Sequence, residues 1–340
     1  MVTNKVLIVE DEKITAMDLK FKLEDLGYEV CGMAVNGADA IKLAYDTEPD
    51  LVLMDITLKG EMNGIKAAKS ILNENIPLIF LTSHTDESTV KEANMVPSYG
   101  FLNKPFDMMK LERTIKLAIN RSKIEIDKIH IAKGEESNLT DEDLKLHEQA
   151  VCEFEAGKDF KEEFLAKKSN PDNTKYKILI VEDEAITALD LQEKIEGFGY
   201  EVVSTENNGE NAIEIAKKQR PDLILMDISL KGSLSGIEVA REVNALNIPV
   251  IYLTANTNNE NVDEALETAP YGFITKPIFD TELKQLIELV IIKHNNDFQK
   301  IIDIEGDNTS SSKSNKESKD DKDSDNEPKF KSLIKGILKN

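Results

Sequence analysis

Short apolar runs alternate along the chain with stretches of helical spacing. Four such runs lie in the first third of the sequence: Val6 to Val9, Leu51 to Met54, Leu78 to Leu81, and Phe101 to Leu102. Runs of this length suit parallel strands that are buried on both faces. Between them, Leu19, Leu23 and Leu26 fall on one face of a helix that Gly27 ends. Strands that alternate with helices predict βαβ units and a parallel sheet.

The whole pattern occurs twice. KVLIVEDE, from Lys5 to Glu12, returns as KILIVEDE, which starts 172 positions later at Lys177. The same offset turns PDLVLMDITLKG into PDLILMDISLKG and IPLIFLTS into IPVIYLTA, without a gap. A repeat of this length is a whole domain, because solenoid repeats are much shorter. We therefore expect two α/β domains, each a doubly wound, flavodoxin-like fold with a five-stranded parallel sheet.

The sequence predicts five segments. The two domains are expected at 1–120 and 176–302, the second with an extended last helix, and 121–175 is expected to be a charged, partly helical linker. Residues 303–328 are rich in Ser, Asp, Lys and Asn and predict an acidic, disordered tail. Residues 329–340, KFKSLIKGILKN, predict a short basic amphipathic helix. Three interpretations of it stay open: docking on a partner, contact with an anionic membrane surface, or packing on its own acidic chain.

Composition narrows the classes of function. A formal net charge of -22 argues against a nucleic-acid partner, since such binding rests on neutralising phosphates with Lys and Arg. The two cysteines, Cys31 and Cys152, supply neither a disulfide framework nor a metal-ligand spacing. No signal peptide or membrane-spanning run is recognised, so a cytoplasmic protein is expected.

Polar side chains follow four of the predicted strands. Glu10 and Asp11 come after the first, Asp55 after the third, Thr82 after the fourth and Lys104 after the fifth. The carboxyl ends of parallel strands share one edge of a doubly wound sheet, where ligands bind. Three neighbouring carboxylates repel one another unless a cation joins them, and Mg²⁺ prefers oxygen ligands. The pattern therefore predicts a Mg²⁺ site beside a nucleophilic aspartate, with a lysine and a threonine to hold a phosphoryl group.

These motifs together resemble the receiver domains of two-component response regulators. The features are an acidic pair, an Asp after an apolar strand, a Thr followed by a small residue, and Lys-Pro. They occur in this order twice, and the resemblance covers Lys5 to about Leu117 and Lys177 to about Leu289. Receivers of this family often pair through the face with the fourth and fifth helices. The resemblance implies that receiver pairing, within or between chains, is possible here.

The resemblance also implies a role for each matching residue. The phosphoacceptors would be Asp55 and Asp227, which take phosphate from a sensor histidine kinase or a phosphotransfer protein. One Mg²⁺ per domain would be held by side chains and by the main-chain carbonyls of Thr57 and Ser229: Glu10, Asp11, Asp55 and Thr57 in the first domain, and Glu182, Asp183, Asp227 and Ser229 in the second. The phosphoryl group would contact Thr82, Lys104, Thr254 and Lys276. The aromatic switch residues would be Phe101 and Phe273.

We therefore expect a phosphorylation-switched signalling protein that acts by protein contact on an unknown output protein. No separate enzymatic or DNA-binding domain is recognised in the remaining segments. One alternative is a phosphate sink or scaffold in which one or both receivers are silent. Another is a phosphatase-type enzyme with an aspartyl phosphate, although such enzymes place their nucleophile after the first strand, where this chain has EDE. The sequence HIAKG at His130 matches the pattern of histidine phosphotransfer domains. The simpler interpretation is that His130 is an ordinary linker histidine.

Overall fold

The computed structural model describes most of the two repeats and part of the segment between them. The described residues are 3–71, 76–83, 87–133, 149–155, 157, 161, 164–165, 175–255 and 259–314. The basic segment 329–340 and the later part of the predicted tail lie outside the described residues.

The first domain is a parallel sheet with helices on both faces. Its elements are β1 (Lys5–Val9), α1 (Lys13–Asp25), β2 (Glu29–Ala34), α2 (Gly37–Thr47), β3 (Leu51–Asp55), α3 (Gly64–Ile71), β4 (Leu78–Thr82), α4 (Glu87–Asn94), β5 (Phe101–Asn103) and α5 (Met108–Lys133). The strand order is β2-β1-β3-β4-β5 and every pairing is parallel. Strands β1, β3 and β4 are buried on both faces, as their continuous apolar runs predict.

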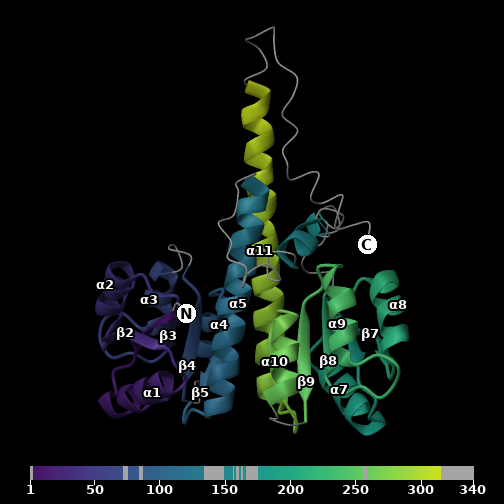
Figure 1. Ribbon diagram of the computed structural model, residues 1–340, viewed down its shortest axis with the longest axis horizontal. Coiled ribbons are helices and arrows are strands. Elements are labelled where there is room, and N and C mark those ends of the chain that lie inside the picture. The colour runs from purple at the N-terminus through teal and green to yellow at the C-terminus, as the bar shows by residue number, and fades with distance from the viewer. Residues whose placement is uncertain are drawn as a thin grey trace.

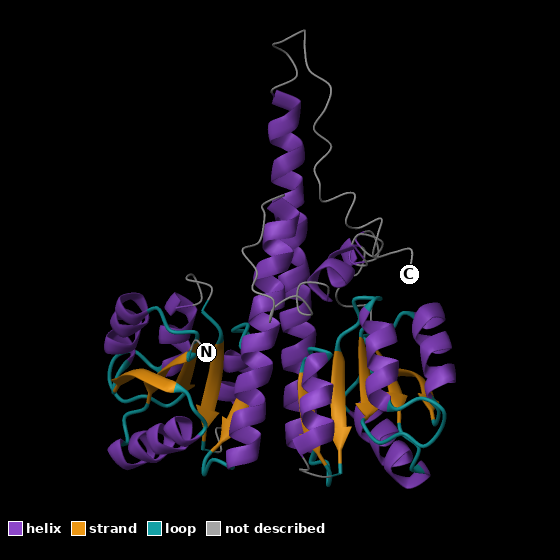
Figure 2. Cartoon of the chain, viewed as in Figure 1, coloured by secondary structure: helices purple, strands orange, loops and turns teal. Residues whose placement is uncertain are grey.

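The second domain repeats this arrangement. Its elements are β6 (Lys177–Val181), α7 (Ala185–Gly197), β7 (Glu201–Glu206), α8 (Gly209–Gln219), β8 (Leu223–Asp227), α9 (Gly236–Asn244), β9 (Val250–Thr254), α10 (Asn259–Glu267), β10 (Gly272–Thr275) and α11 (Asp280–Ser314). The sheet order β10-β9-β8-β6-β7 is that of the first domain, and all strands are again parallel. Figure 2 shows the two sheets, each between helices. The predicted fold class, two doubly wound five-stranded parallel domains, is confirmed.

The last helix of each domain is long. Helix α5 continues to Lys133, into the segment where a partly helical linker is predicted, and α11 continues to Ser314, beyond residue 302. Residues 303–314 are therefore helical where a disordered tail is expected. A helix nucleated by its packed first half adds further turns at little cost, so polar residues can extend it. The two long helices lie side by side between the domains (Figure 1). None of the helices in the described part of the chain has the length and apolarity needed to span a bilayer.

Candidate functional site

The carboxyl edge of the first sheet brings the predicted side chains together. One carboxylate oxygen from each of Glu10, Asp11 and Asp55 lies within 4.8 Å of the others. Glu10 and Asp55 are buried, at 1% and 2% exposure, and Asp11 is half-buried. Strands β1 and β3 are neighbours in the sheet, so their carboxyl ends deliver all three groups to one place. The second domain places Glu182, Asp183 and Asp227 in the same way.

A lysine from the loop after the fifth strand enters each cluster. Lys104 Nζ donates to Asp55 Oδ2 at 2.8 Å and lies 2.6 Å from Glu10 Oε2. In the second domain Lys276 Nζ lies 2.6 Å from both Asp227 Oδ2 and Glu182 Oε2. Each ammonium group therefore bridges the candidate phosphoacceptor and a buried glutamate.

Main-chain groups fix the other oxygen of each candidate phosphoacceptor. The N–H of Thr57 donates to Asp55 Oδ1 at 3.1 Å, and its hydroxyl donates to the same oxygen at 3.2 Å. The N–H of Ser229 donates to Asp227 Oδ1 at 2.8 Å. These hydrogen bonds fix the orientation of the aspartate carboxylate in both domains.

The loop after Asp55 has no room for a side chain at one position. Gly64 opens α3, and its N–H donates to the carbonyl oxygen of Ile56 at 3.1 Å. A Cβ atom at Gly64 would collide with the carbonyl oxygen of Asp55. Gly236 is placed in the same way against Asp227. The close approach of the start of the helix to the main chain of the aspartate therefore requires glycine at this position in both domains.

Burial sets the charge state of the inner glutamates. Burial raises the pKa of Glu10, while the ammonium group of Lys104 acts in the opposite direction. In the second domain burial raises the pKa of Glu182 to about 6, again against the effect of Lys276. Burial disfavours the charged form of Lys104, but hydrogen bonds to Asp55 and Glu10 outweigh it and raise the lysine pKa. In each site, three carboxylates therefore lie together, and the charge of the lysine opposes but does not cancel the effect of burial on the glutamate pKa.

The donor set fits a hard divalent cation. Apart from the ion pairs with Lys104 and Lys59, the buried oxygens Glu10 Oε2 and Asp11 Oδ2 have no hydrogen-bond partner among the described residues. The equivalent oxygens of Glu182 and Asp183 are in the same condition. Buried carboxylate oxygens of this kind are the ligands that Mg²⁺ prefers. A cleft of about 660 Å³ opens over the first cluster and is lined by Asp11, Asp55, Thr57, Lys59, Ser83 and Lys104, among others.

Comparison with known proteins identifies the family. The family model for the response regulator receiver domain matches residues 6–116 and 178–288. The chain belongs to the response regulator receiver family. Both domains are receivers, arranged in tandem, as the sequence predicts.

Two relatives found by sequence agree with this assignment. The chain is 36% identical over 152 residues to the transcriptional regulatory protein PdtaR of Mycobacterium tuberculosis, over 44% of this chain and 72% of that protein. It is 39% identical over 104 residues to the chemotaxis protein CheY of Thermotoga maritima, over 30% of this chain and 86% of CheY. A signal receiver domain from Desulfovibrio desulfuricans is 40% identical, with a TM-score of 0.36, over 36% of this chain and 99% of that domain. Family membership assigns the chain to phosphorylation-switched signalling.

The two predicted switch residues lie in different surroundings. Phe101 is half-buried and stacks on Phe80, with ring centroids 5.7 Å apart. Phe273 is buried beside Tyr252, and the guanidinium carbon of Arg113 lies 5.1 Å from its ring centroid. Arg113 belongs to the first receiver, so the second receiver's phenylalanine is in contact with the other domain.

One pair of residues near the sites is missing from the sequence-based predictions. Lys59 Nζ lies 2.7 Å from Asp11 Oδ2, and Lys231 Nζ lies 2.9 Å from Asp183 Oδ2. Both lysines stand in the loop after the candidate phosphoacceptor, in the repeated LKG. The signal that could have identified them is that Lys59 recurs as Lys231 at the offset of 172 positions. His130, by contrast, lies half-buried on α5 and outside both sites.

Proposed function

We propose that the chain is a two-component signalling protein in which each receiver takes a phosphoryl group from a histidine kinase or a phosphotransfer protein. The acceptors are Asp55 and Asp227, and output is by protein contact. The observation that carries the proposal is the duplicated cluster at the sheet edge. In each copy a buried aspartate is flanked by two carboxylates and held by a lysine at 2.8 Å or less.

The chemistry follows from this placement. A carboxylate oxygen of Asp55 attacks the phosphorus atom of the donor, and the phosphorus–nitrogen bond to the donor histidine breaks. The histidine nitrogen leaves with the bonding electron pair and takes up a proton from water, so no oxidant is needed. Lys104, at 2.8 Å from Asp55, and Thr82, at the end of β4, would contact the transferred oxygens. Lys276 and Thr254 take these roles in the second receiver.

The metal site belongs to the same proposal. Glu10, Asp11, Asp55 and the carbonyl of Thr57 would hold Mg²⁺ in the first receiver, and Glu182, Asp183, Asp227 and the carbonyl of Ser229 in the second. When bound, the cation supplies positive charge against the charge of the phosphoryl group.

The first test is the intact mass of the full chain after incubation with acetyl phosphate, with and without Mg²⁺. We expect two added phosphoryl groups with Mg²⁺ and none after chelation. A single added group would assign one receiver to a silent, scaffold role. No added group in the folded chain would contradict the proposal, and steady turnover of an external phosphoester would favour the phosphatase alternative.

Replacement of Lys59 is expected to tighten Mg²⁺ binding to the first receiver a few-fold. The ammonium group of Lys59 competes with a cation for Asp11, and its contact with Asp11 raises the pKa of the lysine. Removal of this positive charge frees the carboxylate of Asp11 to bind the metal ion. The measurement is calorimetric titration of Mg²⁺ into Lys59→Met, with Lys42→Met on the exposed face of α2 as the control. An unchanged affinity would mean that the Lys59–Asp11 pair is absent in solution.

A further inference from the structure

The two receivers contact each other through equivalent faces. Helix α5 packs against α11, its counterpart in the second domain. The guanidinium carbon of Arg121 lies 4.0 Å from the ring centroid of Tyr271, and Lys293 Nζ lies 3.8 Å from that of Tyr99. The offset of 172 positions relates Arg121 to Lys293 and Tyr99 to Tyr271. The contacts are therefore reciprocal, and an approximate twofold axis relates the two domains.

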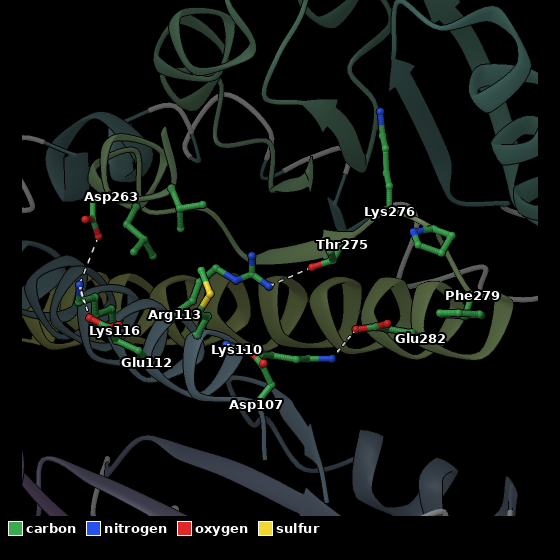
Figure 3. Close-up of a pocket in the computed structure, with 14 residues that line it drawn as sticks. Asp107, Lys110, Glu112, Arg113, Lys116, Asp263, Thr275, Lys276, Phe279 and Glu282 are labelled. Atoms are coloured by element: carbon green, nitrogen blue, oxygen red, sulfur yellow. Dashed lines mark hydrogen bonds and ion pairs between the residues drawn. The ribbon is translucent and has the colours of Figure 1, made fainter. Parts of the chain in front are cut away.

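An ion pair of equivalent residues lies on this axis. Lys110 Nζ is 2.6 Å from Glu282 Oε1, as Figure 3 shows. Lys110 and Glu282 are related by the offset of 172, so each occupies the other's position in its own domain. A residue on a twofold axis meets its own equivalent. If the first receiver paired with a copy of itself, Lys110 would meet Lys110, and in the second receiver Glu282 would meet Glu282.

A second pair away from the axis has the same property. Lys116 Nζ lies 3.2 Å from Asp263 Oδ1 on α10 (Figure 3). The first-receiver equivalent of Asp263 is Lys91, and the second-receiver equivalent of Lys116 is Glu288. Pairing of like receivers would therefore place Lys116 against Lys91, or Glu288 against Asp263. Both arrangements oppose like charges, and such contacts reject wrong partners.

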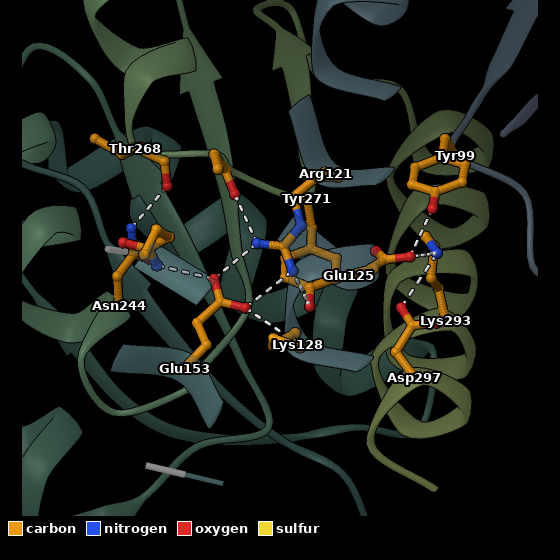
Figure 4. A network of polar contacts seen from close by, with 12 residues as sticks. Tyr99, Arg121, Glu125, Lys128, Glu153, Asn244, Thr268, Tyr271, Lys293 and Asp297 are labelled. Atoms are coloured by element: carbon orange, nitrogen blue, oxygen red, sulfur yellow. Dashed lines mark hydrogen bonds and ion pairs between the residues drawn. The ribbon is translucent and has the colours of Figure 1, made fainter. Parts of the chain in front are cut away.

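The contacts between cations and tyrosine rings do not discriminate in this way. Figure 4 shows Arg121 and Lys293 with the tyrosines of the opposite domain. These four residues keep their charge or their ring in both receivers, so like pairing would preserve their contacts. The inverted charges of these ion pairs fall at three equivalent positions, which are occupied by Lys91, Lys110 and Lys116 in the first receiver and by Asp263, Glu282 and Glu288 in the second. Glu112 and Lys284 are also inverted, but Glu112 pairs with Lys116 of its own helix at 2.8 Å.

We propose that these inverted charges make the two receivers specific partners of each other within one chain and prevent either from pairing with a copy of itself. The inference goes beyond the proposed function and does not depend on phosphorylation. It gives the shared face one occupant, the other receiver of the same chain.

Zero-length cross-linking of the full chain tests where the pairs form. A carbodiimide joins an amine to a carboxylate in direct contact, and a mixture of ¹⁴N- and ¹⁵N-labelled chains marks each linked peptide as intrachain or mixed. We expect Lys110–Glu282 and Lys116–Asp263 links, all within one isotope. Links between the two isotopes at these residues would overturn the assignment to a single chain.

Charge exchange tests whether the inverted residues select the partner. We compare K110E/K116E and D263K/E282K, which each oppose like charges, with the fourfold variant that carries all the changes and restores opposite pairs. Amide hydrogen exchange in α5 and α11 is expected to become several-fold faster in each double variant and to return to the wild-type rate in the fourfold variant. K42E/K66E, on exposed positions of α2 and α3, is the control and is expected to match wild type.

The outcomes separate the proposal from a merely structural role. Two double variants with wild-type exchange would show that the charges select nothing. A fourfold variant that stays as fast as the double variants would attribute their effect to general damage. Either result overturns the proposal, and recovery in the fourfold variant supports it.

Discussion

Replacement of Asp55 by Asn is expected to remove one of the two phosphoryl groups that the chain accepts and to leave the other. The carboxamide keeps the shape of the side chain and its place at the end of β3, but it lacks the negatively charged oxygen that attacks phosphorus. Asp227→Asn is expected to remove only the second group. The expected effect is complete at the altered site, because no other carboxylate in the described part of the chain is held by both Lys104 and the Thr57 N–H. Intact mass with acetyl phosphate and Mg²⁺ measures both.

The control for these variants stands at the other end of the same strand. Asp50 precedes β3, and its carboxylate accepts a hydrogen bond from the Lys5 N–H at 2.7 Å. Asp50→Asn makes the same chemical change at the opposite edge of the sheet, so both phosphoryl groups are expected to remain. Loss of both groups from Asp55→Asn alone would contradict two independent sites and would indicate that the second receiver is phosphorylated through the first.

The sites could be predicted from the sequence because local pattern and topology agree there. A continuous apolar run such as Val6 to Val9 is a buried parallel strand, and the residue after such a strand lies at the ligand-binding edge. The same reasoning missed strand β2 (Glu29–Ala34), whose residues are mostly exposed or half-buried. An edge strand lacks the continuous apolar run because only part of it faces the core.

The contact between the receivers could not be derived from either repeat alone. Arg121 lies between Asn120 and Ser122, and Lys293 is followed by polar residues, so their neighbours in the sequence do not distinguish them from solvent-facing positions. Arg121 and Lys293 are 1% and 5% exposed because the other domain packs against them. Comparison of the two repeats position by position would have exposed the charge inversion at Lys110 and Glu282. Its meaning follows only when the approximate twofold axis is known.

The segment between the receivers supplies a buried charge that the sequence did not predict. Residues 149–155 are helical, and Glu153 among them is 4% exposed. Its oxygens lie 2.7 Å from Arg121 Nη1 and 2.8 Å from Lys128 Nζ (Figure 4). Arg121 also donates to the hydroxyl of Tyr271 at 2.6 Å. Glu153 therefore neutralises two cations of the first receiver at the point where they meet the second.

Glu153→Gln is expected to loosen this junction more than any surface change. The amide keeps the volume but leaves Arg121 and Lys128 buried without their countercharge, and breaking a buried pair in this way costs about 3–5 kcal/mol. Amide exchange in 149–155 and in the second half of α5 should then become faster by roughly two to four orders of magnitude. Glu214→Gln, at an exposed position of α8, is the control and should leave exchange unchanged. Wild-type exchange in Glu153→Gln would mean that Glu153 does not pair with Arg121 in solution.

The pH dependence of the junction provides an independent check. Burial alone would raise the pKa of Glu153, but the charges of Arg121 and Lys128 outweigh it and hold that pKa well below its usual range. A carboxylate whose pKa is lowered by folding stabilises the folded state fully above its unfolded pKa, and this contribution is lost as the pH falls toward the folded value. The difference in exchange between wild type and Glu153→Gln should therefore be constant near neutral pH and should shrink in acid, below about pH 4. A difference that stayed the same down to strong acid would assign the effect to packing and not to the charge of Glu153.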